Sequence, residues 1–397
     1  MTTTINNEHK KLNVPNLRFP EFQGEWEKCR LGDVCTFLSG GTPKIDVKEY
    51  WNGTIPFVSA ISMHDTYILD SKLHISEEGL KHGSRLLTKN NLLLLVRGSM
   101  LWNTIPICLN KNDVAFNQDV KGIIANDTIN NEFLLYWLKS KEQRLKYMVT
   151  GTGLGAGKLD TSDLLSMIIY IPAMKEQDKV ARLLSLFDER IATQSKIIDK
   201  LQSLIKGIVD CTILRKEKNA IVGDVCSISE QIRAEANIDD IITVRLHGNG
   251  VCKSSAENLQ LGATQYYRRR AGQLIYGKQN FHNGAIGIVP ISLDNGITSK
   301  DIPSFDIDEM KCNSVYLLAQ LQSPQYYKPA EALTTGTGSK RLKEETFLKM
   351  PIVLPNKREQ DNIAVLIHRA SMNLDHAKRL LELLSIQKQF LLRQMFI

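Results

Sequence analysis

The glycine-rich stretch Gly151–Leu159, G-T-G-L-G-A-G-K-L, is the segment that comes closest to a known catalytic loop. A phosphate-binding loop has the pattern G-x-x-x-x-G-K-[S/T]. The first glycine stands five positions before the second, and the serine or threonine after the lysine binds magnesium. Thr152 and Leu159 occupy these two positions. We therefore expect a flexible loop or a contact to a DNA backbone here, and no nucleotide site.

Other catalytic signatures are missing as well. The sequence has no G-x-S-x-G elbow, no H-E-x-x-H pair, no dinucleotide-binding fingerprint after a strand, and no Asn/Asp-Pro-Pro-aromatic signature of adenine methyltransferases. Its eight histidines lack ligand spacing, and its seven cysteines are scattered, odd in number and form no C-x-x-C pair. The sequence predicts a chain that is not an enzyme and holds no cofactor, metal or disulfide framework.

Several loops combine Lys or Arg, which bind phosphates, with amide, hydroxyl and imidazole groups that read base edges. A run of charges is usually only a solvated face, so each loop is weak evidence by itself. The candidate DNA-binding residues are Thr42, Lys44, Arg97, Ser99, Asn117, Gln118, Lys158, Arg245, His247, Arg268, Arg269, Lys278, Asn280, His282, Lys340 and Arg341.

The net charge of +7 is unevenly distributed along the chain. A first block, residues 1–174, holds 19 basic and 18 acidic residues, and a second block, residues 217–356, holds 15 of each. Segments 175–216 and 357–397 each carry an excess of three positive charges. DNA binding must therefore depend on local patches. No apolar run reaches the ~20 residues of a membrane span, and the N-terminus lacks a secretory signal, so we expect a cytoplasmic chain without a membrane partner.

The two blocks are copies of one unit. Four sequence landmarks recur in the same order, at offsets that drift only from 191 to 183 residues, which indicates a repeat with small insertions. The landmarks are Gly32-Asp33-Val34-Cys35 with Gly223-Asp224-Val225-Cys226, Gly151-Thr152-Gly153 with Gly336-Thr337-Gly338, Ile171-Pro172 with Leu354-Pro355, and Glu176-Gln177-Asp178 with Glu359-Gln360-Asp361.

Each block mixes strands and helices. Short apolar runs bounded by turn residues predict strands at 55–61, 92–96, 167–171, 241–246, 273–276, 286–291 and 352–354. Helical spacing predicts a helix over 132–149, and its counterpart over 313–333 should be broken or kinked by Pro324 and Pro329.

Segments 175–216 and 357–397 show the 4-3 apolar alternation of a coiled coil, interrupted by Gln194 and Lys388. Both patterns begin at the same point of the repeat, which favours an antiparallel pair over two helices that pack separately. The sequence thus predicts an α+β protein, in which two mixed α/β blocks related by pseudo-two-fold symmetry are joined by two long helices. The expected seam residues are Val180, Leu184, Phe187, Ile191, Ile198, Leu201, Ile205, Ile363, Ile367, Leu374, Leu381 and Leu384.

This arrangement resembles the specificity subunits of type I restriction-modification systems. The resemblance covers nearly the whole chain and rests on I-P-A-M-K-E-Q-D-K-V-A at 171–181, L-P-N-K-R-E-Q-D-N-I-A at 354–364, L-G-D-V and V-G-D-V at the block starts, and S-G-G-T-P at 39–43 followed by Tyr50–Pro56. One departure is that S-I-S-E-Q-I stands where the second block would have its S-G-G-T-P, so we expect the two blocks to read different half-sites.

The resemblance implies that residues 1–174 and 217–356 are target-recognition domains, each reading one half of a bipartite double-stranded DNA site, with helices 175–216 and 357–397 setting the gap. It also implies two modification subunits that carry S-adenosylmethionine and methylate adenine, and restriction subunits that use ATP and Mg²⁺.

Two other classes of function compete with this interpretation. A degenerate methyltransferase or nuclease is disfavoured by the missing motifs. A coiled-coil scaffold with two interaction domains and no DNA affinity needs only the repeat and the helices. The residues alone favour the DNA-binding module through its local polar loops, and the resemblance strengthens that preference.

Overall fold

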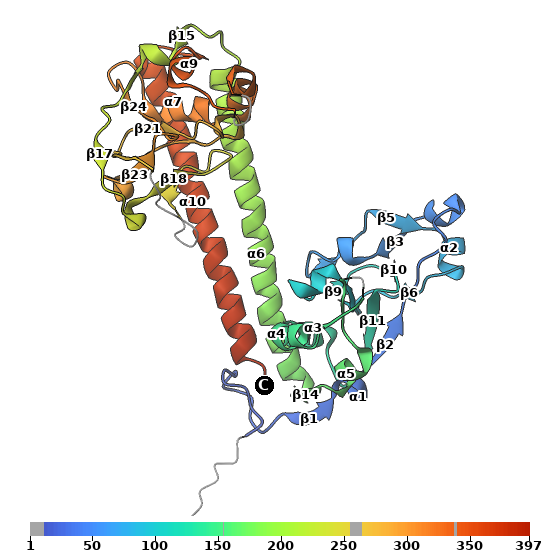
Figure 1. The fold of residues 1–397 in the computed structure, drawn as a ribbon. Helices are drawn as coiled ribbons and strands as arrows, with labels where there is room; N and C mark the ends of the chain where they lie inside the picture. Colours follow the sequence, from blue (N-terminus) through green and yellow to red (C-terminus); the bar gives the residue numbers. More distant parts are fainter. Residues whose placement is uncertain (1–11, 154, 255–263, 337–339) are drawn as a thin grey trace, which may run out of the picture. The chain divides into compact units, whose positions relative to one another are not determined.

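The computed structural model describes residues 12–153, 155–254, 264–336 and 340–397. Thr337 and Gly338 of the repeated G-T-G landmark lie outside these ranges. The chain packs as two compact units, residues 1–194 with 380–397 and residues 195–379, so that both long helices contribute to both units (Figure 1).

The first unit is built on a five-stranded sheet in the order β2-β11-β7-β9-β4. Its central strand, β7, is a run of four fully buried leucines, Leu92–Leu95. A strand covered on both faces reads as continuous apolar sequence rather than as an alternation, which explains this run. Smaller sheets have the orders β5-β3-β10-β6, β12-β13-β8 and β1-β14. The strands are β1 (Glu27–Arg30), β2 (Cys35–Ser39), β3 (Ile55–Val58), β4 (Tyr67–Ile68), β5 (Leu73–Ile75), β6 (Leu86–Leu87), β7 (Leu92–Leu95), β8 (Arg97–Gly98), β9 (Ile107–Asn110), β10 (Val114–Phe116), β11 (Val120–Ala125), β12 (Thr150–Gly151), β13 (Gly157–Lys158) and β14 (Ile168–Ile171).

Helix α3 supplies the largest side chains of the core of this unit. Its residues 133–138 are all buried, among them Phe133, Tyr136 and Trp137. The side chain of Asn130 caps the first turn by accepting a hydrogen bond from the backbone N–H of Phe133 at 3.0 Å. The shorter helices are α1 (Leu31–Val34), α2 (Glu77–Lys81), α3 (Asn131–Ser140), α4 (Glu142–Tyr147) and α5 (Thr161–Ser166), with 3-10 turns at Lys48–Trp51, Ala60–Ser62 and Ser99–Trp102.

The second unit has a four-stranded sheet, β16-β24-β21-β22, beside the sheets β17-β20-β23, β18-β19 and β15-β25. Four aromatic rings, Tyr276, Phe281, Phe305 and Phe347, pack at its centre with centroids 4.7 to 5.8 Å apart. The strands are β15 (Ala220–Ile221), β16 (Cys226–Ile228), β17 (Arg233–Ala234), β18 (Ile242–Val244), β19 (Val251–Lys253), β20 (Tyr266–Arg268), β21 (Leu274–Tyr276), β22 (Ile286–Ile288), β23 (Ile297–Ser299), β24 (Ser304–Ile307) and β25 (Pro351–Ile352). The short helices are α7 (Ser314–Leu321), α8 (Pro324–Tyr327) and α9 (Glu344–Leu348), with 3-10 turns at Val222–Asp224, Ile238–Asp240, Phe281–Asn283, Ile291–Leu293 and Lys328–Leu333.

The repeated Gly-Asp-Val landmark forms the same turn in both units. The Asp33 carboxylate accepts a hydrogen bond from the backbone N–H of Arg30, and the Asp224 carboxylate accepts one from Ile221, both at 2.8 Å. In each unit the strand before this turn pairs antiparallel with the strand that ends the block, β1 with β14 and β15 with β25. The sequence repeat is therefore also a repeat of local structure.

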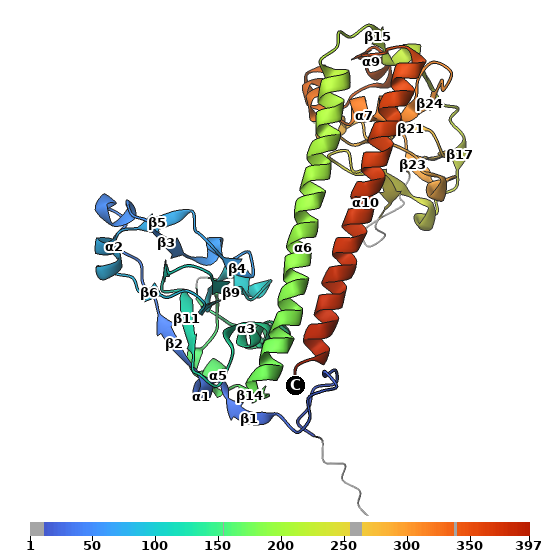
Figure 2. The same ribbon diagram turned by 180° about the vertical axis from the view of Figure 1, so that it is seen from behind.

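The two long helices are α6 (Met174–Val209), continued by a π-helical turn at Asp210–Leu214, and α10 (Lys357–Gln394). In the first unit the start of α6 lies beside the end of α10, where Asp188 and Lys388 form an ion pair. In the second unit the order is reversed, because Val209 and Ile213 pack against Ile363. The helices run antiparallel in each unit, as Figure 2 shows from behind. All twelve predicted seam residues are buried or half-buried.

Every predicted strand region overlaps an observed strand, although the region 352–354 shares only Ile352 with β25. The break predicted for 313–333 is confirmed, since Pro324 opens α8 and Pro329 lies in the 3-10 turn that follows. The prediction of one helix over 132–149 is wrong, because α3 ends at Ser140 and α4 begins at Glu142. Among the described residues no helix has the length and apolar character of a membrane span. All seven cysteines are free thiols.

Candidate nucleic-acid interface

Each block is attached to its own long helix through one buried glutamine. In the first unit the Gln177 side chain accepts a hydrogen bond from the backbone N–H of Asn130 at 2.8 Å and donates to the carbonyls of Thr128 and Pro172 at 3.0 and 2.9 Å. The Asn130 side chain in turn donates to the Asp178 carboxylate at 2.9 Å. This set of contacts, the first clamp, ties the start of α3 to the start of α6.

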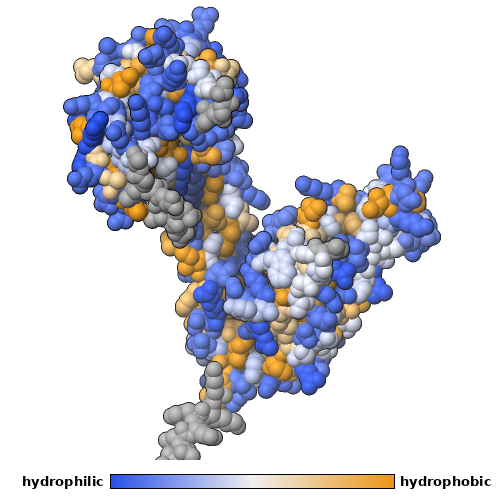
Figure 3. All heavy atoms as spheres, in the orientation of Figure 1, coloured by the Kyte–Doolittle hydropathy of each residue, from blue (hydrophilic) through white to orange (hydrophobic). Residues whose placement is uncertain are grey.

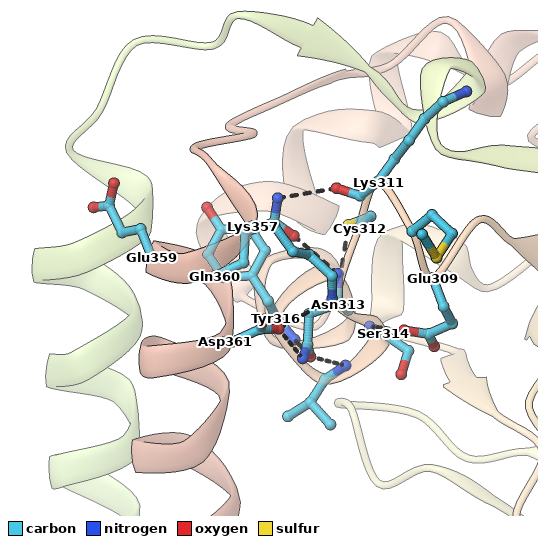
Figure 4. A network of polar contacts seen from close by, with 12 residues as sticks. Glu309, Lys311, Cys312, Asn313, Ser314, Tyr316, Lys357, Glu359, Gln360 and Asp361 are labelled. Carbon is cyan, nitrogen blue, oxygen red and sulfur yellow. Dashed lines mark hydrogen bonds and ion pairs between the residues drawn. The ribbon is translucent and has the colours of Figure 1, made fainter.

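The second unit repeats these contacts 183 residues later (Figure 4). Gln360 accepts from the backbone N–H of Asn313 at 2.9 Å and donates to the carbonyls of Lys311 and Pro355 at 3.1 and 2.8 Å. Asn313 donates to Asp361 at 2.8 Å. Both glutamines are 1% exposed. This second clamp explains why Glu-Gln-Asp opens each long helix, a physical role that the sequence prediction missed.

Six of the predicted DNA-binding residues lie on one edge of the first unit. The backbone carbonyl of Asp119 accepts from the N–H groups of Val96 and Arg97 at 2.8 and 3.3 Å, and Arg97 pairs with Lys158 across β8 and β13. Asn117 and Gln118 immediately precede Asp119 on the same loop. These contacts define the first basic edge, which comprises Thr42, Arg97, Ser99, Asn117, Gln118 and Lys158.

Loop 39–43 is held against this edge by one side-chain and one backbone contact. The Thr42 hydroxyl donates to the Gln118 amide oxygen at 2.6 Å, and the N–H of Gly41 donates to the carbonyl of Phe116 at 3.0 Å. Gly40 approaches the Phe116 carbonyl so closely that a Cβ at Gly40 would lie 2.2 Å from it. The two glycines of S-G-G-T-P therefore allow the loop to reach the edge. Lys44 follows the loop and is exposed.

The second unit has an edge of the same construction. The N–H of Lys278 donates to the backbone carbonyl of Asp301 at 2.9 Å, as Arg97 does to Asp119, and Leu342 donates to the carbonyl of Lys278 at 2.9 Å. Thr335 and Arg341 form an antiparallel bridge, as Thr150 and Lys158 do. The second basic edge comprises Lys278, Lys340 and Arg341.

The two edges differ in how their charges are neutralised. Arg97 is exposed, and among the described residues no carboxylate forms an ion pair with it. Lys158 pairs with Asp160 at 3.4 Å with both side chains nearly half exposed. Lys278 is only 12% exposed and pairs with Glu344 at 2.6 Å. Lys278 thus has a structural ion pair, whereas Arg97 remains available to an external anion.

Arg341 and Lys340 of the second basic edge also have carboxylate partners. Arg341 lies 3.2 Å from Asp301, and Lys340 lies 3.4 Å from Glu331. All four side chains are about half exposed. Ion pairs of this exposure contribute at most about 1 kcal/mol, so a phosphate could displace either carboxylate.

A second group of candidates lies on two neighbouring loops. The N–H of His247 donates to the carbonyl of Asn283 at 2.8 Å, and Gly248 donates to Gly284 at 2.9 Å. These contacts bring together the predicted residues Arg245, His247, Asn280 and His282, of which the first three are exposed.

The prediction for Arg269 is wrong. Successive strand residues point to opposite faces, so Arg268 is exposed while Arg269 points inward and is 0% exposed. Its guanidinium donates to the hydroxyls of Thr298 and Ser304 at 2.8 and 2.9 Å and to the carbonyl of Ile302 at 3.0 Å. Burial lowers the pKa of Arg269 to about 10. This side chain holds β20, β23 and β24 together and does not face DNA.

The region that contains the first basic edge matches a known protein family. Residues 23–203 match the family model of the type I restriction modification DNA specificity domain. This part of the chain is a type I restriction modification DNA specificity domain. The match covers most of the first block, its clamp, the first basic edge and most of α6.

Two relatives illustrate the range of similarity. A specificity subunit of an Escherichia coli type I restriction enzyme is 30% identical over 193 residues, which cover 47% of this chain and 47% of that protein. The aligned region thus spans about half the length of this relative. A specificity subunit from Methanocaldococcus jannaschii is 24% identical over 378 residues, 88% of this chain and 86% of that protein.

A solved structure shares the fold along almost the whole chain. The S subunit of a type I restriction-modification system from M. genitalium covers 97% of this chain and 99% of its own at a TM-score of 0.65, with 15% sequence identity. This likeness supports the predicted α+β fold, with two domains joined by long helices.

Proposed function

We propose that this chain reads DNA for a type I restriction-modification complex and catalyses nothing itself. Each block reads one half of a bipartite site in double-stranded DNA, and the two helices set the gap between the halves. One observation carries this proposal. The DNA specificity domain of the first unit has an exposed Arg97 whose charge is not neutralised, and the second unit repeats the clamp and the basic edge. A scaffold without DNA affinity would not need the repeated basic edges, and nothing favours it.

The proposed catalytic partners are two modification subunits that use S-adenosylmethionine to methylate adenine, and restriction subunits that use ATP and Mg²⁺. These cofactors would belong to the partners. Such a complex acts where the chromosome lies, which is consistent with a cytoplasmic chain.

A row of exposed apolar side chains on α10 offers a surface for a modification subunit. Leu380, Leu383, Ile386 and Phe390 are 46 to 62% exposed and recur every three or four residues, so they form one face of the helix, away from the seam residues Leu381 and Leu384. Figure 3 shows hydrophobic side chains at the surface along the long helices. An exposed apolar face of this kind marks an interaction site.

The test is to sequence methylated adenine in DNA from cells that express this chain with its cognate modification subunit. A second strain would carry a chimera whose residues 217–356 come from a relative. We expect one bipartite motif with a fixed gap, and the swap should change only one half of it. If an active modification subunit leaves no motif that depends on this chain, the proposal fails.

A further inference from the structure

Lys388 is the polar residue that interrupts the apolar pattern of α10, and in the structure it faces Asp188 of α6. The two side chains form an ion pair in which each is only 12% exposed. A buried ion pair contributes little net stability, because desolvation of the two charges offsets most of their attraction. A buried polar residue at one position of a coiled coil instead specifies the register of its helices.

The first block completes this pair. The Tyr136 hydroxyl of α3 donates to the second carboxylate oxygen of Asp188 at 2.8 Å, and the Tyr67 hydroxyl lies 3.1 Å from that of Tyr136. The Lys388 ammonium group also lies 5.6 Å from the ring centroid of Tyr136. Asp188, Lys388 and Tyr136, the polar lock, therefore connect α6, α10 and the first block at one point.

Among the described residues of the second unit, the equivalent positions hold no buried charged pair. The repeat offset of 183 residues, which relates the two clamps, places Ala319 at the position of Tyr136, Ser371 at that of Asp188 and Ile205 at that of Lys388. All three line a cavity of about 440 Å³. In this unit Val209 and Ile367 belong to one apolar cluster, and the ion pair that links the end of the first long helical segment to α10, Lys216–Glu359, is 39–41% exposed rather than buried.

The clamps make register matter. Gln177 fastens the first block to α6, and Gln360 fastens the second block to α10. Each block is thus fixed to one position along its own long helix. A slip by one heptad would move a helix by about 10 Å. Such a slip would separate Lys388 from Asp188 and leave two buried charges without partners.

We propose that the Asp188–Lys388 pair, oriented by Tyr136, fixes the register of the two helices and so selects the gap length in the DNA site. This inference rests on the proposed function, since a gap exists only if the chain reads a bipartite site. Asp188 and Lys388 act as positioning residues that determine specificity without touching DNA.

The experiment measures adenine methylation at half-sites separated by a series of gap lengths, with the full chain in complex with its modification subunit. The test variant D188L/K388M replaces both charges by apolar side chains. We expect this variant to recognise the same half-sites. The ratio of methylation at non-cognate gaps to methylation at the cognate gap should rise about tenfold, which corresponds to ~1.4 kcal/mol. The charge-swapped variant D188K/K388D should keep a single gap.

The matched control is R182M/E189L, which removes an ion pair from the same helix at 3.8 Å with both side chains more than 60% exposed. It should leave gap selection unchanged. An unchanged single gap in D188L/K388M overturns the proposal. Loss of the folded complex in that variant also overturns it, because the pair would then serve stability and not register. Absence of any motif with the unmodified chain would instead refute the proposed function.

Discussion

The side-chain oxygen of Gln177 accepts a hydrogen bond from the backbone N–H of Asn130 at 2.8 Å. This contact joins a long helix to the cap of a helix that begins 47 residues earlier in the chain. The Gln177 side-chain nitrogen also donates to two carbonyls, so the amide acts both as acceptor and as donor. The side chain is almost fully buried from water. A residue with this role is structural, even though it stands in the repeated Glu-Gln-Asp landmark.

Replacing the glutamine of the second clamp should destabilise the second unit. In Q360A the backbone N–H of Asn313 and two carbonyls lose their partner, and a buried polar group without a partner costs about 1–3 kcal/mol. We expect the free energy of unfolding to fall by about 2–4 kcal/mol in urea titrations of the full chain. The control is Q387A, since Gln387 is exposed on the same helix. Equal stability of the two variants would contradict the clamp.

The long helices and the repeat were predictable from the sequence because both follow from periodic patterns. All predicted seam residues are buried or half-buried, and the 183-residue offset of Glu-Gln-Asp proves to be the offset of the two clamps. Periodicity reports which face of a helix is buried. Periodicity does not report hydrogen-bond partners, so the roles of Gln177 and Gln360 follow only from the three-dimensional structure.

The break between α3 and α4 could not be predicted from the sequence. No proline or glycine stands between Ser140 and Glu142. Instead the Lys141 ammonium group donates to the carbonyl of Ile397 at 2.6 Å, a contact with the far end of the chain. Arg269 was misassigned for a different reason. Arg268 and Arg269 have the same residue type, but Arg268 ends β20, and neighbouring side chains along a strand point to opposite faces.

Removal of the Arg97 charge should weaken DNA binding without affecting the fold. In R97A we expect lower affinity for cognate and non-cognate duplexes alike, and a salt dependence whose slope is smaller by about one, as for the loss of one phosphate contact. Fluorescence anisotropy across a series of salt concentrations measures both quantities. K28A is a suitable control, because Lys28 is exposed on β1, in a different sheet. An R97A slope equal to that of the unmodified chain would exclude Arg97 as a phosphate contact.

Arg268 and Arg269 should separate DNA binding from stability. R269M leaves four acceptors, the Gln231 amide oxygen among them, without their buried donor, so we expect a loss of about 2–3 kcal/mol in the free energy of unfolding. R268M removes an exposed charge and should change stability by less than about 0.5 kcal/mol. Urea unfolding and DNA titration of both variants provide the comparison. A stable R269M variant with weakened DNA affinity would reverse the assignment made from burial.

The contribution of Lys139 to the stability of the first unit should rise with pH between about 8 and 10. Burial, followed by the charge of Lys388, lowers the pKa of Lys139 to about 8, below its value in the unfolded chain. Between these two pKa values the unfolded chain binds more protons, so raising the pH favours the folded state. We expect a gain of about 1–2 kcal/mol, less than the full shift implies because the side chain keeps some exposure.

The variant K139M isolates this contribution. Buried thiols such as Cys108, whose pKa burial raises to about 12, act in the opposite direction over the same range. They are common to both proteins, so the difference between the unfolding free energies of K139M and the unmodified chain should change steadily from pH 8 to 10. A pH-independent difference would show that Lys139 stays charged in the folded protein.

Charges on the exposed face of α10 should prevent the modification subunit from binding while the chain remains folded. In L383E/F390E two side chains that are 62% and 56% exposed acquire carboxylates, which would have to be desolvated in an apolar contact. We expect affinity for the purified modification subunit to fall by about 2 kcal/mol or more, roughly thirtyfold in Kd, by isothermal titration. I291E is the matched control, since Ile291 is 88% exposed on a 3-10 turn of the second block. If added charge lowered the affinity for the modification subunit in general, both variants would lose affinity equally. If the modification subunit contacts α10, only L383E/F390E should lose affinity. Unchanged affinity in L383E/F390E would exclude this face as the docking site.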